Sequence, residues 1–210
     1  PSKIEIINPA EGNFSGGTAI SDNKTRFQAD EFSSINFTPD AHFSGDAVIN
    51  YEAFSSELFG SSVSDGVSGT FTITIDPVAD TPSFLIGTVP SGLKNETLSL
   101  VDEGDESIFE LNSPDTDSSE VLRLNVRVIT EGSHQILGVT GVDGLYSFTE
   151  ADLENFQIVP ATDFSGTLSL QIYASSTETG NSAVDQSATQ QFDVFFINVL
   201  DPPTLTTSSQ

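Results

Sequence analysis

Apolar and polar residues alternate with a period of two along several short segments of the chain. Such a period puts every second side chain on the same face of an extended strand. The segments are rich in β-branched and aromatic residues, and Gly, Asn, Asp and Ser separate them. They cover residues 47–53, 70–75, 122–130, 167–174 and 191–199. One other segment, residues 148–156, predicts a single helical turn with Thr149 as its cap. The pattern therefore predicts an all-β chain.

The alternating pattern recurs after 121 residues. This shift places the Phe-Ser-Gly sequence of residues 43–45 on that of residues 164–166, and 13 of the 44 positions between residues 39 and 82 are identical to their counterparts. The apolar positions of residues 47–53 also fall on those of residues 168–174 in the same phase. Because a slip of one residue would exchange the two faces of a strand, agreement in phase is stronger evidence than identity. The chain therefore contains two copies of one structural unit.

Short strands with spaced turns predict an antiparallel β-sandwich, and the repeat predicts two of them in tandem. We expect residues 1–79 to be the C-terminal two thirds of one sandwich, residues 80–203 to be a complete sandwich, and residues 204–210 to begin a linker to another domain. The counterpart of residues 82–120 would precede Pro1, so we expect the first sandwich to lack its N-terminal strands. Two explanations stay open: the domain is cut there, or an inserted module splits it.

The chain is strongly acidic, since 31 Asp and Glu residues against 6 Lys and Arg residues give a formal net charge of -25. Without a basic patch we expect no binding to nucleic acid. No apolar run approaches the length of about 18 residues that spans a bilayer, so we expect no membrane insertion. Cysteine is absent, which excludes disulfides and thiolate chemistry. The charge would attract cations, and it would destabilise the fold unless something binds or screens it.

Carboxylates concentrate in two segments of the second unit, residues 102–106 and 115–120. Asp115 and Asp117 stand two residues apart just before a strand, so an extended backbone directs both side chains to one side. Such clusters suit Ca²⁺, which takes about six to eight oxygen ligands. Zn²⁺ prefers His and Cys, and the chain has 2 His and no Cys. A solvated acidic loop is the alternative to a calcium site, and the spacing excludes an EF-hand loop.

Both units end in a similar step, "DPVADTP" at residues 76–82 and "NVLDPPT" at residues 198–204. Proline stops a strand and favours an extended linker. In an antiparallel sandwich, the last strand of the first unit would bring Asp76 and Asp80 to the end that holds the loop with Asp40. We expect the Asp-x-Asp loop of the second unit to return to the same junction, where carboxylates from both units would converge on calcium.

The second unit contains three distinctive stretches, "DTDSSEVLRLNV", "ADLENFQIVPATDFSGTLSLQIYA" and "FDVFFINVLDPP". These stretches resemble the cadherin-like repeats of giant bacterial RTX adhesins, which are exported by type I secretion. The resemblance implies cadherin/Ig-like sandwiches with Ca²⁺ between them, which stiffens a long rod. It also implies calcium ligands at positions of this chain, with the first three ahead of the others: Asp80, Asp115, Asp117, Asp76, Asp40 and Glu120. Glu103 and Asp201 would serve the next junction.

The chain departs from the cadherin pattern at three positions. Ala79 stands in the linker, where cadherins are richer in Asp and Asn. The acid expected after the Ala of the penultimate strand is replaced by Ser55 in the first unit and by Ser176 in the second. Because each change removes a carboxylate, we expect fewer bound ions per junction than in animal cadherins.

These features predict a calcium-stabilised extracellular segment of a bacterial surface adhesin. Its domains would be rigid extenders that position a ligand-binding tip for adhesion to cells or surfaces, including in biofilms. We expect a monomer whose partners are the neighbouring domains of the same long chain. The alternative is a ligand-binding module for a host-surface glycan or peptide, or a split domain that flanks an inserted lectin-like module.

Two further features bear on the choice of function. His42 and His134 are the only histidines and fall in different units, and Asp163 replaces His42 in the second copy, so we expect no enzyme. The less regular segment around Phe54, Leu58 and Phe59 would be either a hydrophobic plug or a ligand-binding loop. Most phenylalanines, such as Phe71, Phe192 and Phe196, stand at strand positions that face a core.

Overall fold

The computed structural model describes residues 2–55, 63–115 and 119–200, which fall into two compact units. Unit 1 comprises Pro1–Val78 with Asp115–Ser119, and unit 2 comprises Ala79–Pro114 with Glu120–Gln210. Strands dominate both units, and the described residues contain only two short helical segments. Almost all strand pairs are antiparallel, so the all-β antiparallel fold that the alternation predicted is confirmed.

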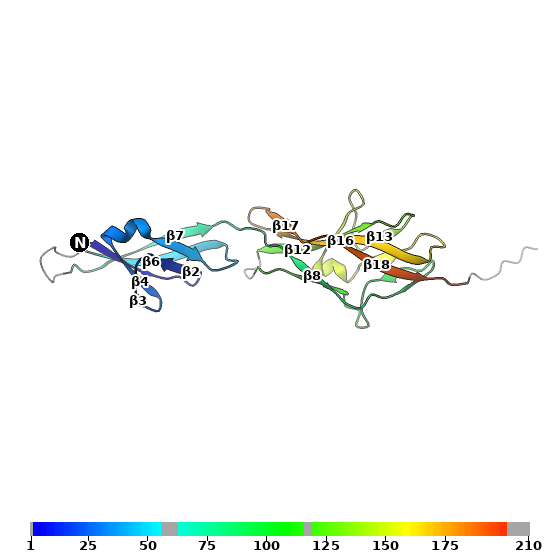
Figure 1. Cartoon of the computed structure of the whole chain (residues 1–210), viewed down its shortest axis with the longest axis horizontal. Helices are drawn as coiled ribbons and strands as arrows, with labels where there is room; N and C mark the ends of the chain where they lie inside the picture. Colours follow the sequence, from blue (N-terminus) through cyan, green and yellow to red (C-terminus); the bar gives the residue numbers. More distant parts are fainter. Residues whose placement is uncertain (1, 56–62, 116–118, 201–210) are drawn as a thin grey trace, which may run out of the picture. The chain divides into compact units, whose positions relative to one another are not determined.

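Unit 1 combines a five-stranded sheet in the order β3-β4-β1-β6-β7 with a two-stranded sheet of β2 and β5 (Figure 1). Its elements are β1 (Ser2–Ile7), β2 (Gly12–Ser15), β3 (Thr18–Ser21), β4 (Lys24–Gln28), the 3-10 helix η1 (Ala29–Ser34), β5 (Asn36–Pro39), β6 (Gly45–Ser55) and β7 (Val67–Ile75). The buried residues of both sheets form one cluster of Ile6, Phe14, Phe27, Ala47 and Ile49. This core is small, since the described residues of unit 1 contribute five buried apolar side chains to it.

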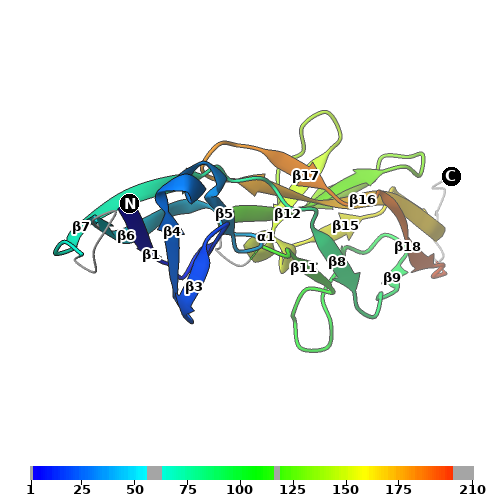
Figure 2. The same cartoon turned by 60° about the vertical axis from the view of Figure 1, so that its left-hand side comes forward.

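Unit 2 has a six-stranded sheet in the order β14-β12-β16-β18-β9, with β17 paired to β16 (Figure 2). A two-stranded sheet of β11 and β8 and a three-stranded sheet in the order β10-β15-β13 share its core. The elements are β8 (Ser83–Ile86), β9 (Gly92–Leu93), β10 (Leu98–Ser99), β11 (Phe109–Asn112), β12 (Glu120–Val128), β13 (Gln135–Leu137), β14 (Tyr146–Thr149), α1 (Glu150–Leu153), β15 (Gln157–Val159), β16 (Gly166–Glu178), β17 (Val184–Gln186) and β18 (Gln190–Ile197).

Strand β16 shows how the sequence pattern becomes a buried face. Every second residue from Leu168 to Glu178 is buried, and those between are not. The first four buried residues of this row are apolar, as the core of a sandwich requires. The last two, Ser176 and Glu178, are polar and equally buried. The inner face of the sheet therefore continues beyond the apolar core into a polar end.

The two units repeat not only in sequence but also in strand register. In unit 1, Gly45 pairs with Ile75, and in unit 2, 121 residues further on, Gly166 pairs with Phe196. The connecting loops also match, because His42 and Asp163 have the same φ of 62°. Non-glycine residues adopt this left-handed conformation only rarely, and Asn, Asp and His tolerate it best. A backbone requirement therefore accounts for His42 and its replacement by aspartate.

The apolar row of β7 is less covered than its counterpart on β18. Phe71 is 40% exposed, whereas Phe192 at the matching position is 3% exposed. In unit 2, Phe109 of β11 packs edge-on against Phe192 with 5.2 Å between the ring centroids. Among the described residues, unit 1 has no strands that correspond to β8–β11. Phe71 thus has the predicted strand phase, opposite the buried Ile49, but it is only partly covered because strands corresponding to β8–β11 are not among the described residues of unit 1.

The helical turn predicted at residues 148–156 is confirmed as α1. The backbone N–H and the hydroxyl of Thr149 both donate to Oδ2 of Asp152, at 3.0 and 2.6 Å. These bonds hold the pKa of Asp152 below its usual range, with the bond from the Thr149 side chain as the largest cause. Thr149 and Asp152 together form the capping box that starts many helices.

Candidate metal centre

The start of unit 2 is fastened to the ends of three strands of its largest sheet. The backbone N–H of Asp80 donates to Oε1 of Glu120 at 2.5 Å, and the hydroxyl of Ser176 donates to the Asp80 carbonyl at 2.6 Å. The next residue, Thr81, donates its hydroxyl to the carboxylate of Asp185 on β17. These three bonds place Asp80 beside Glu120, so the structure brings together two of the residues that the sequence predicted as calcium ligands.

Glu120 and Glu178 stand directly opposite each other where β12 begins and β16 ends. Directly opposite residues of antiparallel strands point to the same face, with Cβ atoms about 5 Å apart. Ser176 is two residues from Glu178 on β16, and Asp185 lies opposite Ser176 on β17. All four side chains therefore share the inner face at one end of the sheet. Glu120 also accepts a hydrogen bond from the hydroxyl of Ser113.

Glu178 is the most buried carboxylate at this end. Its exposed fraction is 3%, and its Oε2 atom has no hydrogen-bond partner among the described residues. None of the ion pairs found in the described part of the chain involves Glu178. Burial of a carboxylate without a partner is costly, so this oxygen stands out from the rest of the molecule.

Asp185 is the more exposed acid of the same end. The hydroxyl of Thr81 and the backbone N–H of Gln186 hold its pKa below the usual range, with the Thr81 bond as the larger cause. Asp185 is therefore a carboxylate at neutral pH. Asp185 therefore has two roles. Its Oδ2 atom accepts the hydrogen bond from Thr81 that holds the start of unit 2, and its charge makes this end of the sheet more negative.

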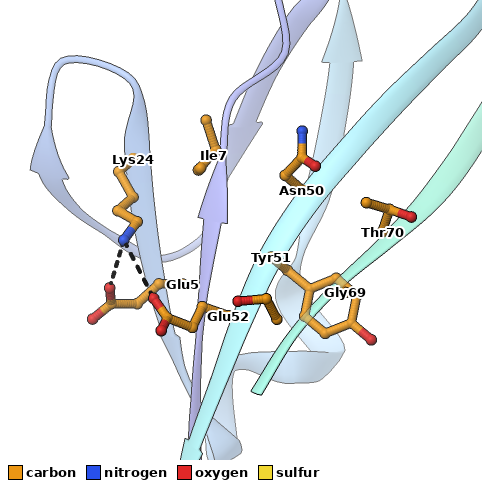
Figure 3. A pocket seen from close by; sticks show the side chains of 9 residues that line it. Glu5, Ile7, Lys24, Asn50, Tyr51, Glu52, Gly69 and Thr70 are labelled. Carbon is orange, nitrogen blue, oxygen red and sulfur yellow. Dashed lines mark hydrogen bonds and ion pairs between the residues drawn. The ribbon is translucent and has the colours of Figure 1, made fainter. Parts of the chain in front are cut away.

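A second cluster of charged residues lies on the outer face of the unit 1 sheet and lines an open hollow (Figure 3). Glu5, which is 7% exposed, accepts hydrogen bonds from Arg26 at 2.9 and 2.7 Å and from Lys24 at 3.0 Å. Lys24 also lies 3.9 Å from Glu52. Burial opposes ionisation of Glu5, but the bonds from Arg26 and Lys24 outweigh it and lower the pKa of this carboxyl. The cluster is neutralised internally and offers no free carboxylate to a metal.

The remaining predicted ligands lie elsewhere. Asp40 is in the loop that connects β5 to β6, and Asp76 follows β7 directly, so both are at the same end of unit 1. Asp115 accepts a hydrogen bond from the Ser119 hydroxyl at 3.2 Å. Glu103 is in the turn between β10 and β11, which Asp102 closes by accepting the N–H groups of Gly104 and Glu106. Asp117 and Asp201 lie outside the described residues, as do Leu58 and Phe59.

Within the described part of the chain, no three His, Cys, Asp or Glu side chains are grouped closely enough to hold a metal ion by themselves. The donor set at the end of unit 2 nevertheless has the chemistry that Ca²⁺ requires. It consists of carboxylate, hydroxyl and carbonyl oxygens, contains no basic residue, and includes one buried oxygen without a partner. We therefore regard Asp80, Glu120, Glu178 and Asp185 as the candidate metal centre.

The two histidines do not contribute to a common site. His134 makes structural contacts in unit 2: Nδ1 accepts the N–H of Ala161 at 3.0 Å, and Nε2 lies 3.1 Å from the carbonyl of Glu131. Its ring packs edge-on against Phe164, with 4.6 Å between the centroids. His42 belongs to unit 1, where its conformation suits the loop.

Sequence reasoning missed Glu178, Asp185 and Ser113. A signal for Glu178 was present, because Glu57 occupies the matching position 121 residues earlier, and Glu178 is two residues from Ser176 and so on the same face. No comparable signal marked Asp185 or Ser113, since their roles depend on contacts with Thr81 and Glu120 that are distant in sequence.

A scan against models of protein families found no match, and neither did a search of curated proteins. Among solved structures, the chain is similar to the crystal structure of human mucin-like protocadherin EC1-2, with 14% sequence identity and a TM-score of 0.47. The similarity covers 93% of this chain and 85% of that chain. At this identity and TM-score the likeness carries no argument about the chemistry of the site. No helix in the described residues has the length and hydropathy needed to cross a membrane.

Proposed function

We propose that the chain is a calcium-binding segment of an extracellular adhesin of a bacterial surface. Its β-sandwich units act as extenders that position a ligand-binding tip, and their partners are the neighbouring domains of the same long chain. The resemblance of three sequence stretches to the repeats of RTX adhesins supports this function. The protein is a structural module rather than an enzyme, and it is expected to be a monomer.

One observation carries the calcium part of the proposal. Asp80, the aspartate of the step between the two repeats, is held by its backbone at the end of a sheet that also presents Glu120, Glu178 and Asp185. In the proposed function, calcium binds these carboxylates, and Asp115 and Asp117 are expected to contribute to calcium binding. Calcium ligation offsets the mutual repulsion of the acids, which would otherwise loosen the region.

Calcium is expected to stabilise and stiffen the chain at the concentrations found outside cells. Sites of extracellular modules have dissociation constants of about 10⁻⁴ to 10⁻³ M, and a tenfold excess over that constant adds about 1.4 kcal/mol per site. Thermal unfolding followed by circular dichroism and small-angle X-ray scattering, in EDTA and in calcium, will measure both effects. A higher melting temperature and a larger maximum dimension in calcium are expected.

The matched variant is the double substitution Asp115→Asn with Asp117→Asn, which keeps side-chain size and removes two charges. It is expected to keep the β-sheet spectrum and to lose most of the calcium-dependent extension. An unsubstituted chain with the same melting temperature and scattering in EDTA and calcium would show that the acidic segments are merely solvated.

The second candidate function is ligand binding, and the surface of unit 1 favours it. A shallow hollow there is lined by apolar side chains that include Phe32, Phe54 and Val67, of which Phe32 is 44% and Val67 is 70% exposed. Exposed apolar groups of this kind can take up a peptide or a sugar ring. Glycan-array and peptide-array binding distinguishes this module from a pure extender, because an extender retains nothing on either array.

A further inference from the structure

Two glutamates in the described part of the chain are buried, and they differ in the charged groups that surround them. Glu5 is 7% exposed and Glu178 is 3% exposed. Glu5 is neutralised by Lys24 and Arg26, with Lys3 at 3.6 Å as a third cation. Three of the 6 basic residues of the chain are thus gathered around one carboxylate. Glu178 has no such neighbour, and its Oε2 lacks any partner in the described structure.

In the described part of the chain, acidic and hydroxyl-bearing residues are the side-chain neighbours of Glu178 in strand register, and none of the ion pairs found there supplies it with a cation. Glu120 lies opposite on β12, and Asp185 lies diagonally across on β17. The hydroxyl of Ser176, which might have donated to Glu178, is bonded to the carbonyl of Asp80 instead. Carboxylate and carbonyl oxygens therefore gather at this end of the sheet. A cation bound from solution would compensate their negative charge.

Glu178 is also held in place, as a ligand should be. Its backbone N–H donates to the carbonyl of Ala183 at 2.9 Å, and its own carbonyl accepts the N–H of Ser182 at 3.0 Å. These bonds close the turn between β16 and β17 and fix the last residue of a 13-residue strand. A side chain on such a rigid element keeps its direction without a partner of its own, which lowers the entropic cost of binding an ion.

We propose that Glu178 is a direct ligand of a divalent cation of the calcium type at this end of unit 2, with Glu120 as the neighbouring carboxylate. Calcium tolerates irregular geometry and accepts carboxylate, carbonyl and water oxygens, so a site with two acidic side chains is completed by solvent. The assignment rests on the proposed function, since it names a ligand of the same calcium-binding end. Sequence reasoning had not identified this residue.

The test compares Glu178→Gln with the unsubstituted 210-residue chain. The control is Glu110→Gln, which makes the same change of charge at an exposed position of β11 in the same unit. Calcium titrations by calorimetry and thermal unfolding are made at about 0.15 M NaCl, where long-range charge effects are largely screened. Hydrogen exchange of residues 174–186, read by mass spectrometry, reports the site locally.

Glu178→Gln is expected to weaken calcium binding by a factor of at least about 10. Even groups that only support the ligands of a metal contribute a factor of about 10–100 to its affinity. In EDTA the same variant is expected to be at least as stable as the unsubstituted chain, since it removes the charge from a buried carboxylate whose Oε2 has no partner. The effect of the substitution therefore changes sign between EDTA and calcium. Glu110→Gln is expected to behave like the unsubstituted chain in both conditions.

The outcomes separate this assignment from the proposed function. If the unsubstituted chain does not bind calcium, the calcium part of the proposed function fails and this assignment fails with it. If calcium binds and Glu178→Gln binds it equally well, only this assignment is overturned. Equal loss of stability in EDTA and in calcium would show a purely structural glutamate and would also overturn it. Should the variant not fold, hydrogen exchange of the unsubstituted chain decides: calcium must slow exchange at residues 174–186, and unchanged rates there contradict the assignment.

Discussion

At the scale of single residues, the two buried glutamates, Glu5 and Glu178, differ in whether basic side chains neutralise them. Glu5 receives hydrogen bonds from two basic side chains of the neighbouring strand, so the protein stabilises it without outside help. Glu178 stands opposite Glu120 and near Asp185 at the end of its sheet, and its Oε2 has no hydrogen-bond partner among the described residues. With few basic residues available, most acids of this chain depend on solvent, salt or bound cations.

Glu5→Gln is expected to destabilise unit 1 by about 2 kcal/mol at neutral pH, because charged hydrogen bonds to Lys24 and Arg26 are lost. The pKa of Glu5 is lowered in the folded state, so its contribution is fully present above the pKa of the unfolded chain. It is lost as pH falls through the lower, folded pKa. Urea unfolding at neutral and acidic pH measures this, and the difference between the two proteins should shrink with acidity.

The control for that experiment is Glu52→Gln on the same face of the sheet. Glu52 has a side chain that is 38% exposed and lies 3.9 Å from Lys24, so the cost should stay below about 0.5 kcal/mol. If Glu52→Gln proved as costly as Glu5→Gln, total charge rather than the buried contacts of Glu5 would be responsible.

At the scale of elements, the two repeats share strand registers but differ in what covers them. The pairs Ile4–Phe27 in unit 1 and Leu124–Phe148 in unit 2 occupy matching places in their sheets. Among the described residues, the same backbone pattern thus forms with a core of five buried apolar side chains in unit 1 and a much larger core in unit 2. Register depends on local alternation and on turns, whereas burial depends on strands that come from elsewhere in the chain.

Phe192→Ala is expected to cost about 3–5 kcal/mol, the range for a fully buried phenylalanine. Phe71→Ala should cost clearly less, because Phe71 already exposes 40% of its surface to water. Unfolding by denaturant, monitored by hydrogen exchange, gives the free energy of unfolding of each unit separately. Equal costs would mean that Phe71 is covered in solution by something that the described residues do not include.

At the scale of the whole molecule, the charge of -25 sets the conditions under which the chain is stable. Self-repulsion of this size opposes compact structure, and salt or bound ions relieve it. The chain is therefore expected to be least stable in EDTA at low ionic strength, where neither bound cations nor salt offset the repulsion between its acids.

Raising NaCl from about 0.02 to 0.5 M in EDTA is expected to increase the melting temperature, since it shortens the screening length. Calcium at matched ionic strength should add a further increase, and Mg²⁺ should add less, because it is smaller and gives up its water reluctantly. Differential scanning calorimetry measures all three conditions. If NaCl alone reproduced the calcium effect, screening would explain it and a specific site would not be needed.

The sequence by itself was sufficient to predict the long strands, the helical turn at Thr149 and the two-copy organisation. These features depend on alternation over a few residues, on capping side chains and on repetition, all of which are local. The resemblance to cadherin-like repeats also implied that Asp80 and Glu120 are calcium ligands, and both acids stand next to strand ends in the sequence pattern. Short strands such as β9 and β10 could not be predicted from the sequence, since two residues show no periodic alternation of apolar and polar side chains.

Only the tertiary structure decided which acids are buried and what lies opposite them. Glu178 continues the inner face of β16 into a polar end, where β12 and β17 flank the strand on either side. The half-covered state of Phe71 likewise follows from neighbours and not from its own position in the pattern. A period of two determines on which face a side chain stands, but the free energy of that side chain depends on what packs against the face, and this is known only once distant segments have come together.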